Sequence, residues 1–196
     1  MPEFIFFVFF IGFIGFVIYY SYKTCEKQKA VLRNLASSIG LENMEIGAGF
    51  PVPSMTGIYK GKRIRIDIRP GGKNTPPYMY VWLYTGSPFN LTVYPEGALQ
   101  KLGKNLGLVN EIQIGVPEFD EKFIIKSDQA ALASRYLSSE MNRKIIESIL
   151  STGFLSIEIR KSEIEIYRPT YNVQNDASPD QLQPVLDGLV ALSLSL

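Results

Sequence analysis

The sequence predicts an α+β protein, with an N-terminal single transmembrane helix followed by a curved antiparallel sheet that has helices packed on one face. Three observations lead to this fold class. A run of seventeen uncharged residues, Phe4–Tyr20, opens the chain. Segments with the alternation typical of strands follow it in groups. Helical patterns interrupt these groups instead of separating every pair of strands, which argues against a doubly wound parallel sheet.

The run Phe4–Tyr20 has the length and composition of a membrane anchor. As a helix it spans about 25 Å, a little less than the roughly 30 Å hydrocarbon core of a bilayer. Tyrosines border its C-terminal end, and Lys23, Lys27 and Lys29 come next. Because positive charge is retained on the cytoplasmic side, we expect a single-pass protein of the cell inner membrane, with the N-terminus outside and the C-terminal domain cytoplasmic.

The anchor also carries residues that favour packing against other membrane helices. It contains seven phenylalanines, more than hydrophobicity alone requires, and two glycines that would let a second helix approach closely. The alternative is a helix that faces only lipid. The residues predicted to serve in anchoring and helix packing are Phe4, Phe7, Phe10, Gly12, Gly15, Tyr19 and Tyr20.

We divide the chain into a transmembrane anchor at residues 1–22, a juxtamembrane amphipathic helix and loop at residues 23–54, and a soluble α+β domain at residues 55–196. The juxtamembrane helix is expected over Cys25–Ile39, where apolar residues form one stripe and Gly40 stands at the C-cap. Residues 41–54 contain repeated glycines and prolines, which predict a loop.

Four strands are expected in the first half of the domain. Residues 56–60 and 63–68 flank Gly61 as a hairpin, and three isoleucines of the second strand alternate with charged residues. Strands follow at residues 78–84 and 89–94, and we expect all four to form an antiparallel meander. The segment 97–110 contains three glycines and could be a short helix or an irregular excursion.

The second half of the domain is expected to add two strands, two helices, a hairpin and a final helix. Strands at residues 111–114 and 122–126 flank a turn, and Ser127 and then Ser138 or Ser139 are candidate helix N-caps. A hairpin over residues 154–168 follows. A Ser178 capping box with proline at the first helical position then opens an amphipathic C-terminal helix, in which Pro184 could delay the start.

Three stretches resemble landmarks of uncharacterised bacterial proteins of unknown function, many of them membrane-associated. They are Leu35-Ala-Ser-Ser-Ile-Gly-Leu, Gly57-Ile-Tyr-Lys-Gly-Lys-Arg-Ile-Arg-Ile and Gly115-Val-Pro-Glu-Phe-Asp-Glu-Lys-Phe-Ile-Ile-Lys-Ser. The match covers most of the soluble part, with these landmarks in the same order. The resemblance implies a bacterial origin and a compact domain, and it transfers no activity.

The chemical inventory argues against catalysis. The chain has no histidine and a single cysteine, which removes the commonest general base, Ser-His and Cys-His pairs, and zinc or iron-sulfur sites built from these ligands. We therefore expect no enzyme, no cofactor and no metal. The acidic cluster Glu118, Asp120 and Glu121 could bind a divalent cation, but a carboxylate that fixes a turn by accepting local amides is favoured.

Basic residues gather in the membrane-proximal part of the chain. Residues 21–74 hold ten lysines and arginines against four acids, whereas residues 75–196 hold ten against fourteen. These basic residues could contact anionic headgroups or a partner, and the alternative is that they form a solvated sheet face. Nucleic acid is not expected as a partner because the net charge is +1. The predicted membrane-surface or partner contacts are Lys23, Lys27, Lys29, Lys60, Lys62, Arg63, Arg65 and Arg69.

The last feature that bears on function is a row of aromatic residues. Tyr78, Tyr80, Trp82 and Tyr84 share one face of a strand, and a core or an interface is favoured over a base-stacking platform.

Together these features predict a non-enzymatic, membrane-anchored accessory or scaffolding subunit of a larger membrane protein complex. Its expected partners are membrane proteins of that complex and the lipid bilayer, including anionic headgroups. The alternatives are a membrane-tethered binding module for a lipid or other apolar ligand, and an enzyme that uses carboxylates with Tyr or Lys in a cleft.

Overall fold

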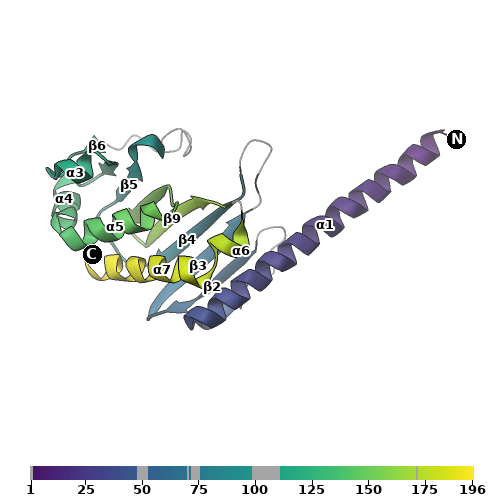
Figure 1. Cartoon of the computed structure of the whole chain (residues 1–196), viewed down its shortest axis with the longest axis horizontal. Coiled ribbons are helices and arrows are strands. Elements are labelled where there is room, and N and C mark those ends of the chain that lie inside the picture. The colour runs from purple at the N-terminus through teal and green to yellow at the C-terminus, as the bar shows by residue number, and fades with distance from the viewer. Residues whose placement is uncertain (1, 48–52, 70, 72–75, 99–110, 171) are drawn as a thin grey trace.

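The computed structural model describes residues 2–47, 53–69, 71, 76–98, 111–170 and 172–196, with only the backbone for residues 2–5. Within them lies a nine-stranded sheet of order β1-β2-β3-β4-β9-β8-β5-β7-β6, in which every pairing is antiparallel. Helices pack on one face (Figure 1). The predicted α+β class is confirmed.

The strands are β1 Glu42–Ile46, β2 Ser54–Tyr59, β3 Lys62–Arg69, β4 Tyr78–Tyr84, β5 Leu91–Pro95, β6 Glu111–Ile112, β7 Phe123–Ser127, β8 Ser156–Arg160 and β9 Glu163–Pro169. The helices are α1 Pro2–Ile39, α3 Pro117–Asp120, α4 Ala130–Ser138, α5 Glu140–Ser151, α6 Val173–Asp176 and α7 Pro179–Leu194, with a 3-10 turn, η1, at Glu96–Ala98.

Helix α1 joins the apolar N-terminal run to the sheet without a break (Figure 1). Side chains from Phe6 to Tyr20 are exposed, whereas Leu32 and Leu35 are fully buried. The helix ends as predicted before Gly40, whose φ of 67° is the left-handed conformation that glycine adopts without strain. Within the described part of the chain, α1 is the one helix long and apolar enough to cross a membrane.

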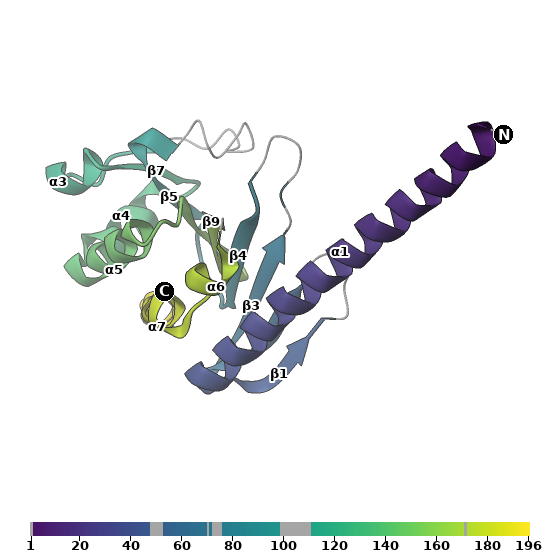
Figure 2. The same ribbon diagram turned by 45° about the vertical axis from the view of Figure 1, so that its right-hand side comes forward.

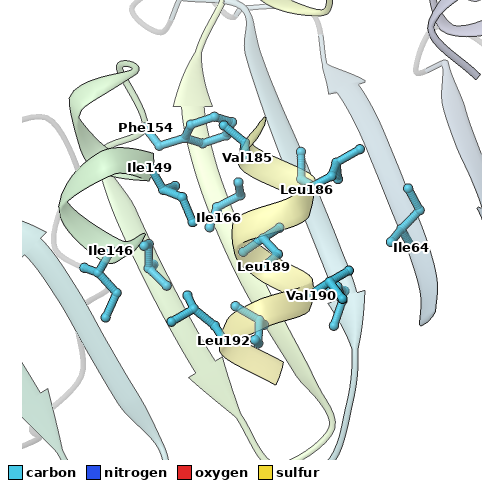
Figure 3. Packing of buried hydrophobic residues seen from close by; sticks show 14 of the residues in the cluster. Ile64, Ile146, Ile149, Phe154, Ile166, Val185, Leu186, Leu189, Val190 and Leu192 are labelled. Carbon is cyan, nitrogen blue, oxygen red and sulfur yellow. The ribbon is translucent and has the colours of Figure 1, made fainter. Parts of the chain in front are cut away.

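The hydrophobic core lies between the sheet and the layer formed by α4, α5, α7 and the second half of α1 (Figure 2). Helix α7 runs over the middle of the sheet, and its leucine stripe lies against the isoleucines of the strands and of α5 (Figure 3). Leu186, Leu189 and Ile166 are all fully buried there. The amphipathic C-terminal helix predicted from the sequence is therefore confirmed.

The loop predicted at residues 41–54 is wrong in part, because residues 42–46 form the edge strand β1. Side chains of its first four residues are exposed, so the strand shows no apolar alternation. Main-chain pairing with β2 defines it instead, with an irregular register between Glu42 and Glu45, where Asn43 has a φ of 49°. The predicted domain boundaries at residues 22 and 54 stay predictions.

The four-strand meander is also wrong at its last member. Strands β2, β3 and β4 are neighbours, but β5 pairs with β8 and β7, and β9 occupies the place beside β4. The predicted hairpin of β8 and β9 is confirmed, and Ile157, Ile159, Ile164 and Ile166 point into the core as expected. Because four buried isoleucines line one side of that hairpin, it fits the centre of the sheet.

The capping predictions have mixed outcomes. Ser139 caps α5 by accepting a hydrogen bond from the Asn142 amide. Ser127 instead ends β7 and donates to the Asn90 carbonyl, and α4 begins three residues later. Ser178 precedes α7 without a side-chain capping bond, and Pro184 lies inside the helix rather than delaying it. The undecided segment 97–110 lies outside the described residues except for Gly97 and Ala98, which belong to η1.

Candidate functional site: the open face of the sheet

Helices cover one side of the sheet, and the residues that alternate to the other side form a patterned surface. We call it the open face. Neighbouring strands bring its residues together in rows, of which Arg65, Trp82 and Glu165 form one. The open face is made of Arg63, Arg65, Asp67, Arg69, Tyr78, Tyr80, Trp82, Tyr84, Glu158, Arg160, Glu163, Glu165 and Tyr167.

The middle of the open face is an aromatic row along β4, extended by Tyr167 of β9. The rings of Tyr80 and Trp82 stack with centroids 5.1 Å apart, and Tyr78 meets Tyr80 edge-on at 5.6 Å. Tyr167 lies 5.2 Å from Tyr80. The predicted sharing of one strand face is confirmed. Because these rings are half-buried and face away from the helices, they belong to a surface rather than to the core.

A basic strip borders the aromatic row on the β3 side. Arg65 donates from Nε and Nη2 to the two carboxylate oxygens of Asp67, at 2.7 Å each, and Arg69 reaches the same carboxylate at 3.6 Å. Asp67 is fully buried beneath them. The Arg65 guanidinium lies 5.3 Å from the Trp82 ring centre and the Arg69 guanidinium 5.7 Å from that of Tyr80. Ion pairing and cation-π contact therefore hold these arginines in place.

An acidic strip borders the row on the other side. Arg160 reaches Glu158 at 2.7 Å, Glu165 at 3.0 Å and Glu163 at 3.5 Å. The Trp82 indole N–H donates to Glu165 at 2.7 Å. Burial raises the pKa of Glu165 above its ordinary value, although the Trp82 hydrogen bond and the Arg160 charge oppose the rise.

The aromatic row therefore separates two regions of the open face that differ in the sign of their net charge. On the β3 side Arg65 and Arg69 share one aspartate and Arg63 lies over the Tyr84 ring, which leaves an excess of positive charge. On the β8 and β9 side three glutamates share one arginine, which leaves an excess of negative charge. Such a surface is suited to recognising a partner of complementary charge, with rigid rings as anchors.

Strand alternation separates the basic residues that the sequence groups together. Lys60 lies in the β2–β3 turn with a φ of 47° and donates to Asp187 of α7 at 2.7 Å, beside a 2.6 Å hydrogen bond from Tyr59. Burial disfavours the ionised form of Asp187, but these two donors outweigh it and lower the pKa of that carboxyl. Lys62 alternates with the arginines and lies on the helix-covered side.

The predicted anchor residues stand apart from the open face, on α1. Phe7, Phe10, Tyr19 and Tyr20 are exposed. A methyl group added at Gly12 or Gly15 would meet no described atom within 4 Å, and the side chain of Phe4 lies outside the described residues.

The lysines after the anchor differ in their partners. Lys23 lies 6.0 Å above the Tyr19 ring centre, and Lys29 pairs with Glu26 at 3.1 Å. The side-chain ammonium of Lys27 has no hydrogen-bond or ion-pair partner among the described residues.

The acidic cluster at residues 118–121 fixes a turn, which is the alternative that the sequence favours over a cation site. Asp120 accepts hydrogen bonds from the amides of Ile114, Gly115 and Val116 at 2.9 to 3.1 Å. Phe119 packs against a second ring from β7 with centroids 4.7 Å apart. In the part of the chain that the structure describes, no group of three or more His, Cys, Asp or Glu side chains could hold a metal ion.

A groove between α5 and α7 was not foreseen from the sequence. It has a volume of about 680 Å³. Lys144 and Glu140, paired at 2.6 Å, border it. The sequence signal was the pair of small residues Gly188 and Ala191, three positions apart on an otherwise leucine-rich helix. The apolar lining of the groove consists of Met141, Ile145, Ile149, Pro184, Gly188 and Ala191.

No protein-family model matches the sequence, and no curated protein matches it. Among solved structures, the crystal structure of the mycobacterial trehalose monomycolate transport factor A, TtfA, is similar. The match covers 83% of this chain and 94% of that chain, with a TM-score of 0.54 and 13% sequence identity. The similarity is one of fold. At this identity it transfers neither residues nor ligand.

Proposed function

We propose that this protein is a non-enzymatic, membrane-anchored accessory or scaffolding subunit of a larger membrane protein complex. It would cross the cell inner membrane once, with the N-terminus outside and the α+β domain in the cytoplasm. The observation that carries the proposal is the continuity of α1, which is uncovered and apolar from Phe6 to Tyr20 and enters the core at Leu32.

That continuity supports a positional mechanism. A helix of 38 residues is about 57 Å long. Because its second half packs beneath the sheet, the domain cannot swing freely about the anchor. The domain would therefore meet a neighbouring membrane protein in one orientation and at a high effective concentration, without any chemical step.

The open face is the docking surface in this proposal. Its partner would be the cytoplasmic surface of an integral membrane protein, acidic where it meets β3 and basic where it meets β8 and β9. The argument is charge complementarity, because the two strips carry opposite excess charge on either side of the aromatic row. The acidic strip would repel phosphate backbones, which disfavours nucleic acid as the partner.

The test is purification of the tagged full-length protein in mild detergent, followed by quantitative mass spectrometry. Arg63→Glu reverses an exposed charge of the basic strip, and Arg135→Glu makes the same change on α4, on the helix-covered side. We expect a stoichiometric integral membrane protein with the wild type and with Arg135→Glu, and its loss by tenfold or more with Arg63→Glu. A wild-type protein that purifies alone would refute the proposal.

A second candidate function rests on the groove between α5 and α7. We propose as the alternative a membrane-tethered module that binds a lipid or other apolar ligand there. The apolar lining and the volume of about 680 Å³ support it. So does the fold shared with TtfA, which is a trehalose monomycolate transport factor.

Two tryptophan substitutions on α5 test the alternative. Ser148→Trp would fill the groove, and Ser151→Trp adds the same ring at an exposed position of the same helix outside it. Native mass spectrometry should find a lipid bound to the wild type and to Ser151→Trp but not to Ser148→Trp. Equal lipid content in the two variants would refute the assignment of the groove.

A further inference from the structure

A small pocket with a mixed polar and apolar lining lies where α1 leaves the apolar anchor. Lys27 and Gln28 of α1 line one side, Asn172 and Gln174 of the α6 segment line the other, and Thr24, Val31 and Val173 complete the lining. Its volume is about 220 Å³, which holds a phosphate group with part of the glycerol to which it is bonded. Helix α6 packs against α1 here, so two elements distant in the sequence form the walls (Figure 1).

The chemistry of the pocket is that of an anion site. Lys27 brings a charge that no described residue neutralises, while its neighbour Glu26 is engaged by Lys29. The acid on the facing helix, Asp176, is engaged by Arg168 at 2.5 Å. The side-chain amides of Gln28, Asn172 and Gln174 add N–H donors, and none of the residues that line the pocket is acidic.

The position of the pocket along α1 matches the headgroup layer of a membrane. At 1.5 Å per residue, Lys27 lies about 10 Å beyond Tyr20 along the helix axis. Helical side chains lean toward the N-terminus, so the long lysine side chain extends back toward the bilayer. Headgroups occupy roughly the first 5 to 8 Å outside the hydrocarbon core. The Lys27 ammonium therefore reaches phosphate depth if Phe4–Tyr20 spans the membrane.

We propose that this pocket binds the phosphate headgroup of an anionic phospholipid, which would lock α6 onto α1 at the membrane surface. The inference rests on the proposed function, because it requires the anchor to be inserted. It goes beyond general attraction to a charged membrane in assigning one lipid to one site. A free phosphate ion would present the same oxygen acceptors, and the experiment must separate the two sources.

The test uses the full-length protein in vesicles of phosphatidylcholine with and without phosphatidylglycerol. Lys27→Gln removes the pocket cation, and Lys23→Gln removes an equal charge one helical turn closer to the bilayer, outside the pocket. Flotation reports insertion, and native mass spectrometry after mild delipidation reports retained lipid. Wild type and Lys23→Gln should retain one phosphatidylglycerol, and Lys27→Gln should retain about fivefold less.

The possible outcomes distinguish failure of the lipid-binding pocket from failure of the proposed membrane-anchored function. Failure of every variant to float with vesicles would refute the anchor and with it the proposed function. Flotation with equal lipid retention in Lys27→Gln and Lys23→Gln would refute the pocket alone. Displacement of the retained lipid by inorganic phosphate would assign the site to the free anion and overturn the lipid proposal.

Discussion

Replacement of Asp67 by asparagine tests whether the open face is held in place from below. Asp67 is fully buried and accepts two hydrogen bonds of 2.7 Å from Arg65, with Arg69 at 3.6 Å. Asparagine keeps the volume but offers one acceptor oxygen, and it turns an amide N–H₂ toward an arginine that can only donate.

The expected decrease in the free energy of unfolding follows from these contacts. Each hydrogen bond to a charged group contributes about 1.5 to 3 kcal/mol. The two arginine side chains are 41% and 42% exposed, so water recovers part of the loss, and removal of a buried charge offsets more of it. We expect the free energy of unfolding to fall by about 2 to 3 kcal/mol.

Urea unfolding of the full-length protein in detergent micelles measures this change. Fluorescence of the sole tryptophan, Trp82, reports directly, because its ring stacks against Arg65. The urea midpoint should fall while the slope with denaturant stays constant. Glu45→Gln, an exposed carboxylate on the edge strand β1, is the control and should change stability by less than about 0.5 kcal/mol. An equally small effect of Asp67→Asn would refute the reasoning.

Three further predictions concern single positions. Gly57→Ala should destabilise the fold by about 1 to 3 kcal/mol, since its Cβ would lie 2.6 Å from Leu41 and 3.0 Å from the Glu42 carbonyl; an unchanged urea midpoint would contradict this. Asp120→Ala leaves three amides of a turn without their acceptor and should cost about 1 to 3 kcal/mol, with faster amide hydrogen exchange at residues 114–116 as the local readout. Glu165 has a raised pKa, so the folded protein binds its proton more tightly than the unfolded chain, and its contribution to stability falls as pH rises above the ordinary value of 4.5. Wild type should therefore lose stability relative to Glu165→Gln between pH 4 and 7, and a difference independent of pH would exclude this effect.

The fold was predictable wherever one stretch of chain carries its own periodicity. The alternation in β3 and in the β8–β9 hairpin, and the leucine stripe of α7, placed these elements on their correct faces. Glu42–Ile46 was missed because an edge strand with exposed side chains has no periodic signal. The place of β5 was missed because the sheet puts the later hairpin between it and β4.

The candidate site was predictable in its parts but not in its arrangement. The aromatic row is visible in the sequence as residues two apart, and Arg65 and Arg69 are likewise two strand positions on either side of Asp67. The acidic strip was not foreseen, because Glu158 and Glu165 reach the aromatic row only through the pairing of β9 with β4. Lys60 and Lys62 were grouped with the arginines, although the turn and the strand alternation direct them elsewhere.

By itself, the sequence determined the apolar N-terminal helix, the α+β class and the lack of histidine, because these depend on composition and on periodicity within one segment. The tertiary structure decided which face of the sheet the helices cover and which strands are neighbours. It thereby decided that basic, aromatic and acidic strips lie side by side on one open surface. The physical reason is that pairing between distant strands is selected by burial of the whole apolar face, which no local stretch of residues encodes.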